Sequence, residues 1–353
     1  MYVIPFLMEI VIKKECVIIK KFLLFFVGGM LLLLAIPLQP NETISKFAQP
    51  VNQQIDQIVY GKSNETVLKT PKEQEFAMRN IQMNMNRKAV EAKLGQPKAE
   101  IGNKYGTKWF VYHQDFNDFV MVSYINQKVH GLYTNQNMMT SKSGVKYGTA
   151  KDVVRAELGT PIKGFHKGRT IYEIDNEEYD VFDDDGIYTT VFYDKHENNQ
   201  LTGMLQVSHL MENQLTHQYA APSNYLRESF EKQDFYLLNA ERVQKGLHPL
   251  AFSESLAKTA RKHSTDMAKH HYFDHTNQQG ESPFDRMKKD GHQYQTAAEN
   301  LAYGQTDAIF AHHGLMNSLG HRKNILNTDV TQIGIGVDFN AQRQPYWTEN
   351  YIG

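Results

Sequence analysis

Residues 270–276, "HHYFDHT", and residues 318–326, "SLGHRKNIL", decide how this chain is interpreted. The first stretch holds three histidines, two aromatic residues and an aspartate, and it closes a helical pattern that begins at Ser253, a typical N-cap residue. The apolar spacing of that pattern is expected to point His271 inward. If the chain leaves the helix after Phe273, the ring of His275 can face a cleft, which makes it the functional candidate of this stretch.

Helix-length patterns separated by glycine and proline surround both stretches. Helices are predicted in "FYLLNAERVQKG" (235–246) and in "SPFDRMKKDG" (282–291), where serine, proline and glycine stand at the usual start and stop positions. The runs "QIGIGVDF" (332–339) and "PYWTENYI" (345–352) are β-type segments. The pattern over residues 225–353 therefore predicts a domain that combines helices with a sheet.

The order of these motifs resembles one known family. The succession "LLNAERVQKGLHPL", "YFDHT", "SPFDRMKKDGH", "AENLAYG", "MNSLGHRKNIL", "IGIGVDF" and "YWTENYIG" is similar to the CAP superfamily, the cysteine-rich secretory, antigen 5 and pathogenesis-related (SCP-like) proteins, in their disulfide-free bacterial form. The resemblance covers residues 225–353. It implies an α+β fold, an α-β-α sandwich, with a cleft lined by two histidines and one or two glutamates.

Carried over residue by residue, the resemblance implies that the cleft histidines are His275 and His321 and that the first glutamate is Glu299. The second glutamate of the family falls on Ser318, and Ala298 stands where the family usually has glycine. These departures weaken the expectation of a complete catalytic or metal-binding set.

Two imidazoles and one carboxylate can bind Zn²⁺ or another divalent metal with an open position, and they can equally act as a general base with an orienting carboxylate. No His-Glu-x-x-His motif occurs, and no Gly-x-Ser-x-Gly motif lies near these residues. Whether the protein is an enzyme stays open. The missing glutamate and nucleophile favour a surface binding module for a lipid, a peptide or a cell-wall glycan. The alternatives are a metal-assisted extracellular hydrolase or peptidase and a structural component of the envelope or spore surface.

An internal repeat precedes this domain. "KAVEAKLGQPKAEIGNKYGTKWFVY" begins at Lys88 and "KDVVRAELGTPIKGFHKGRTIYEI" begins at Lys151. Each copy starts with a short helical pattern, stops at Leu-Gly-x-Pro and continues in aromatic and β-branched runs that predict antiparallel strands. Residues 86–208 thus predict a β-rich tandem-repeat domain, which resembles the CAP-associated N-terminal domain of bacilli, and residues 209–224 predict a linker.

The N-terminal sequence has the pattern of an export signal. Four lysines within residues 1–21 precede an apolar segment at residues 22–38, and residues 39–85 are polar and predict a stalk. Basic residues ahead of the run place residues 1–21 in the cytoplasm and the rest of the chain outside. A cleaved signal peptide and an uncleaved membrane anchor both fit, and the pattern favours the anchor slightly. The expected location is the outer face of the membrane or the exterior.

The composition limits the partners further. The formal net charge is -1, so nothing in the electrostatics favours a nucleic acid. The single cysteine, Cys16, excludes an intramolecular disulfide. An exported chain without disulfides is more typical of a Gram-positive bacterium than of a eukaryotic secretory pathway.

Overall fold

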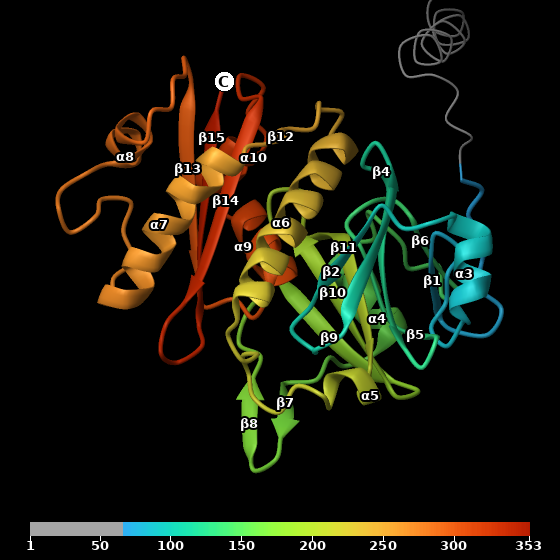
Figure 1. Cartoon of the computed structure of the whole chain (residues 1–353). Helices are drawn as coiled ribbons and strands as arrows, with labels where there is room; N and C mark the ends of the chain where they lie inside the picture. The colour runs from blue at the N-terminus through green and yellow to red at the C-terminus, as the bar shows by residue number, and fades with distance from the viewer. Residues whose placement is uncertain (1–65) are drawn as a thin grey trace, which may run out of the picture. The chain divides into compact units, whose positions relative to one another are not determined.

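The computed structural model of the protein describes residues 66–353 (Figure 1). The predicted cytoplasmic N-terminus, the apolar segment 22–38 and residues 39–65 lie outside the described residues. Between residues 66 and 353, no helix is both long enough and apolar enough to cross a membrane. The fold belongs to the α+β class, with a β-rich part followed by a domain of helices and one sheet.

The end of the predicted stalk belongs to the folded unit. Strand β1 (Phe76–Met78) pairs antiparallel with β6 (Met139–Ser141), and Phe76, Met78 and Ile81 are buried in the core. The prediction of a polar stalk over residues 39–85 is therefore wrong from Phe76 onward. The apolar residues there are flanked by charged and amide side chains, so the composition hides a short strand whose three residues are all buried.

Each copy of the repeat begins with a helix, α3 (Arg87–Leu94) or α4 (Lys151–Leu158), which stops at a glycine with positive φ. An antiparallel sheet follows in the order β2-β3-β4-β5-β11-β10-β9. Its strands are β2 (Ala99–Gly102), β3 (Lys108–Gln114), β4 (Asn117–Ile125), β5 (Lys128–Thr134), β9 (Tyr179–Asp184), β10 (Ile187–Asp194) and β11 (Gln200–Ser208). Strands β7 (Gly164–Lys167) and β8 (Thr170–Glu173) form a separate hairpin. Val90 of α3 and Val154 of α4 pack in the core on one face of the large sheet, which leaves the other face for the C-terminal domain.

The C-terminal domain has a sheet between helices. Its strands, in the order β12-β14-β15-β13, are β12 (Ala251–Phe252), β14 (Gln332–Phe339), β15 (Pro345–Ile352) and β13 (Ala297–Tyr303). Its helices are α6 (Asn224–Gln244), α7 (Glu254–His270), α8 (Pro283–Lys289), α9 (Ala308–Asn317) and α10 (Leu319–Ile325). Helix α7 lies directly on β14 because Gly334 leaves room for it: a Cβ atom there would come within 2.3 Å of the backbone of Leu256 and Ala257.

The two domains share a hydrophobic core. Figure 1 shows α6 between the repeat sheet and the C-terminal sheet, and apolar residues of both sheets meet it in one cluster. Gln233 Nε2 donates to the carbonyl of Gly102 at 2.7 Å across this contact. Residues 209–224, predicted as a linker, contain helix α5 (His209–Glu212) and the buried Leu215.

Candidate functional site

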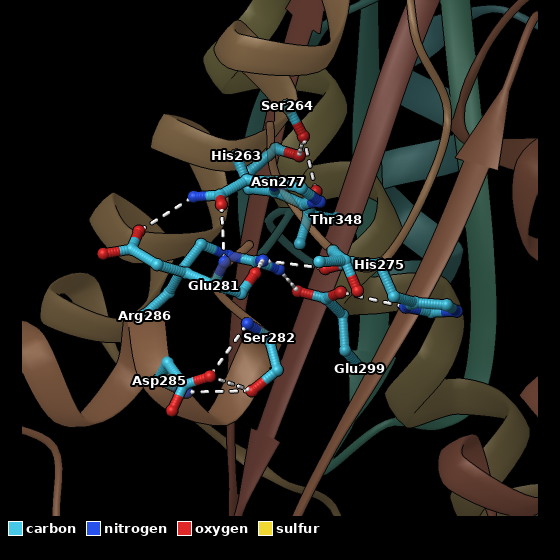
Figure 2. A network of polar contacts seen from close by, with 12 residues as sticks. His263, Ser264, His275, Asn277, Glu281, Ser282, Asp285, Arg286, Glu299 and Thr348 are labelled. Atoms are coloured by element: carbon cyan, nitrogen blue, oxygen red, sulfur yellow. Dashed lines mark hydrogen bonds and ion pairs between the residues drawn. The ribbon is translucent and has the colours of Figure 1, made fainter. Parts of the chain in front are cut away.

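The side chain of Glu299 is the centre of the candidate site. It lies on β13 with 1 % of its side chain exposed, and its Oε2 atom accepts a 2.7 Å hydrogen bond from Nη2 of Arg286 (Figure 2). Arg286 lies on the short helix α8, which Ser282 and Asp285 begin with a capping box. The cap fixes the start of α8, and so the direction in which Arg286 leaves it.

His275 meets the second oxygen of the same carboxylate. Its Nδ1 atom lies 2.9 Å from Glu299 Oε1, and Arg286 Nη1 donates to the carbonyl oxygen of His275 at 2.7 Å. Helix α7 ends at His270, and His271 caps it in the left-handed region at φ 56°. The expectation that His271 points inward is wrong, because the chain turns there and its side chain is exposed.

His321, the second histidine that the resemblance implied, lies on α10. The side chain of Asn300, the residue after Glu299, donates to the carbonyl oxygen of His321 at 3.2 Å. Asn324 Nδ2 donates to Asn300 Oδ1 at 2.8 Å and to the Glu299 carbonyl at 3.3 Å. These amide contacts tie α10 to β13 beside the carboxylate.

The two imidazoles have opposite electrostatic surroundings. The hydrogen bond to Glu299 raises the pKa of His275 above its ordinary value, against the opposing effect of partial burial. Burial lowers the pKa of His321, and the charge on His275 lowers it further. At a pH near 6.5 the arrangement therefore favours a protonated His275 beside a neutral His321.

Comparisons with known proteins identify both domains. Residues 235–351 match the family model of the cysteine-rich secretory protein (CAP) family, and residues 83–218 match that of the CAP-associated N-terminal domain. The chain belongs to the bacterial CAP-domain proteins.

Two relatives from Bacillus subtilis (strain 168) match this CAP-domain protein in sequence. YkwD is 45 % identical over 134 residues, which are 38 % of this chain and 50 % of YkwD, so the chain spans half the length of that relative. The membrane protein YlbC is 27 % identical over 281 residues, which are 74 % of this chain and 80 % of YlbC.

Two solved structures share the fold. An extracellular protein with an SCP domain from Bacillus anthracis is 23 % identical, with a TM-score of 0.67 over 82 % of this chain and 99 % of that one. A cysteine-rich secretory protein from Staphylococcus aureus is 18 % identical, with a TM-score of 0.58 over 76 % of this chain and 93 % of that one.

In this arrangement the carboxylate of Glu299 is not free to serve as a metal ligand. Each oxygen of Glu299 already accepts a hydrogen bond, one from Arg286 and one from the Nδ1 side of His275. A metal ion bound to Glu299 would need one of those oxygens, and leaving Arg286 unpaired in the interior costs free energy. Within residues 66–353, no three His, Cys, Asp or Glu side chains are grouped so that they could hold a metal ion.

Sequence reasoning missed the residues that hold the CAP site together. Arg286 was inside a correctly predicted helix, but nothing in the helical spacing shows that it reaches a carboxylate on a strand. Ser318, which replaces the second glutamate of the family, stands at the N-cap position of α10, and its side chain makes no capping hydrogen bond. It gives the site no carboxylate and no evident base.

Proposed function

We propose that this protein is an extracytoplasmic binding module, which engages a lipid, peptide or cell-wall ligand at the face that carries His275 and His321. The observation that carries the proposal is the pairing of Glu299 with Arg286 at 2.7 Å. A carboxylate held in this way orients His275, and its two oxygens are already taken by Arg286 and His275, so neither is free to accept a proton from a substrate. The imidazoles are left as the groups that a ligand can reach.

Two exposed apolar side chains lie close in sequence to the histidines and support binding. Phe273 precedes His275 by two residues and is 49 % exposed, and Leu319 precedes His321 by two residues and is 54 % exposed. A ligand with a polar and an apolar part can hydrogen-bond to an imidazole and cover an exposed apolar side chain. This combination suits an amphipathic ligand better than a small polar substrate.

The proposed location rests on the N-terminal sequence and on the relatives. YlbC is described as a membrane protein, and the Bacillus anthracis structure is described as extracellular. Together with the lysines ahead of residues 22–38, they support an outward-facing chain that is anchored or secreted. A protease added to intact protoplasts is expected to remove the C-terminal domain, and full protection of that domain would contradict the proposed location.

Sedimentation of the full chain with purified cell walls, and separately with lipid vesicles, tests the binding. A Phe273→Ala, Leu319→Ala double variant is expected to lower the bound fraction several-fold. The control is Val153→Ala, which removes an apolar side chain of similar exposure (49 %) from the repeat domain. Equal binding by the double variant and the control would place the ligand elsewhere.

A further inference from the structure

A cavity lies where the repeat domain meets the CAP domain. It has a volume of about 360 Å³, and residues of β10 and β11 line it from the repeat sheet. The hairpin β7–β8 contributes from one side, and the segment after β13 together with α9 contributes from the other. Neither His275 nor His321 lines it, so it is separate from the site described above.

Aromatic rings from both domains line this cavity. Tyr179 of the repeat domain meets Phe310 of the CAP domain edge to face, with ring centres 5.1 Å apart. Phe165 of the hairpin meets Tyr188 of β10 in the same way at 5.0 Å, and Tyr172 adds another partly exposed ring. Such rings present electron-rich faces that attract cations.

The charges around the cavity leave a surplus of carboxylates. The two lysines that line it are buried and already paired, Lys104 with Asp307 at 2.8 Å and Lys167 with Glu212 at 2.6 Å. Glu173 and Asp175 also line the cavity; both are exposed, and neither forms an ion pair with any residue in the range 66–353.

On one wall of the cavity, the protein's own ammonium group, that of Lys104, already lies against aromatic rings. The Nζ atom of Lys104 lies 4.8 Å from the ring centre of Phe310 and 5.2 Å from that of Tyr105. We propose that the cavity binds an organic cation, a primary ammonium or a guanidinium group, which lies against the exposed aromatic faces and is neutralised by Glu173 and Asp175. An anionic ligand would be repelled by those same carboxylates, and a neutral one would gain no electrostatic attraction from them.

Such a cation can come from a basic peptide or from an amino sugar, and paired probes distinguish the two sources. Calorimetry of the full chain uses a trilysine peptide with blocked ends and the same peptide acetylated on its side chains. A glucosamine disaccharide and its N-acetylated form are the second pair. We expect at least one amine probe to bind and its acetylated form to bind about tenfold more weakly, with affinity falling as salt rises. Binding of neither amine, or equal binding of the acetylated forms, overturns the proposal.

Two variants test the groups that make the site. The double variant Glu173→Gln, Asp175→Asn is expected to weaken amine binding several-fold. The double variant Asp184→Asn, Asp185→Asn makes the same change in net charge at the exposed β9–β10 turn, away from the cavity lining, and is expected to bind like the wild type. Tyr172→Leu keeps an apolar surface but removes a ring face, and it should also weaken amine binding. Equal effects of the two double variants would mean that only the overall charge matters, which would overturn the site.

Discussion

The guanidinium of Arg286 is paired with the carboxylate of Glu299 in the interior of the CAP domain, with 8 % and 1 % of the two side chains exposed. Arg286 also donates to the carbonyl oxygens of His275 and Glu281 at 2.7 and 3.0 Å. One side chain thus fixes the loop that carries His275 and the carboxylate that orients its ring. A buried charge with several partners is expected to be indispensable for the local structure.

We therefore predict that Arg286→Met lowers the free energy of unfolding by about 3–5 kcal/mol, because it leaves Glu299 charged and partly unpaired in the interior. Lys262→Met is the matched control, since Lys262 is 68 % exposed and pairs with Asp290 on the surface. The control should cost less than about 1 kcal/mol. Urea unfolding of both variants measures the difference. Similar losses of unfolding free energy would show that the buried Arg286 pair contributes no more to stability than a surface pair.

The family resemblance implied that His275 and Glu299 share a cleft, and the structure joins the two side chains by a hydrogen bond. The contact between Arg286 and Glu299 could not be read from the sequence, since it depends on how α8 is placed against β13. The burial of Phe76 was hidden for a similar reason: a three-residue strand has no periodicity of its own, and only its pairing with β6 reveals it. The cavity between the domains likewise depends on packing that no linear pattern expresses.

A second prediction concerns two buried acids. Asp234 of α6 and Glu349 of β15 lie side by side with no exposed surface, and within residues 66–353 neither oxygen of Asp234 has a hydrogen-bond donor. Burial and the neighbouring carboxyl raise the pKa of Asp234 well above its ordinary range, so the pair holds at least one proton in the folded state. An unfolded chain releases that proton above a pH of about 3.9.

Stability should therefore fall as the pH rises above this value, because the folded state binds more protons than the unfolded one. Asp234→Asn supplies a permanent donor to Glu349 and is expected to stabilise the fold by about 1–3 kcal/mol at pH 8. Asp184→Asn, an exposed aspartate, is the control. Unfolding by urea at pH 5 and pH 8 measures both variants. A loss of stability in Asp234→Asn at pH 8 would show that the pair is held by a charge rather than by a proton.

A third prediction uses the opposite surroundings of the two histidines. The raised pKa of His275 means that its pairing with Glu299 stabilises the fold fully below about pH 6.5, and that this stabilisation is lost as the pH rises through the folded-state value. The lowered pKa of His321 means that protonation opposes folding, so its effect on stability improves as the pH rises towards about 6.5 and above.

The wild type should accordingly be more stable than His275→Gln by a margin that shrinks from pH 5.5 to pH 8. Over the same range, the stability of the wild type relative to His321→Gln should increase. Thermal unfolding across this range measures both. Parallel trends in the two variants would contradict the assigned surroundings.

A fourth prediction concerns metals. Since Arg286 and His275 occupy the oxygens of Glu299, we expect calorimetric titration of the wild type with Zn²⁺ to give no saturable heat from this site. Saturable heat that disappears in both His275→Ala and His321→Ala, but not in His248→Ala, would contradict this expectation and favour the metal-assisted hydrolase. His248 suits the control because it is exposed, whereas His312 is fully buried and its loss would disturb the core.

The last prediction tests how far the CAP domain depends on the repeat domain. The fragment 220–353 contains its own sheet and the helices on both sides of it, and we expect it to unfold cooperatively. It should be less stable than the full chain, because the face of α6 and α9 that joins the shared core becomes exposed. Arg322 offers a sharper measurement, since its guanidinium donates to Asp194 at 2.6 Å and to Glu197 at 3.0 Å in the repeat domain.

Arg322→Met should lower the free energy of unfolding of the full chain by about 3 kcal/mol, because Asp194 is left buried without its partner. The same substitution in the fragment should change stability by less than about 0.5 kcal/mol, because both carboxylates are absent there. Unfolding of the four proteins in urea gives the comparison directly. A fragment without a cooperative transition would show that the CAP domain folds only with the repeat domain. Equal effects of Arg322→Met in both backgrounds would show that this ion pair does not couple them.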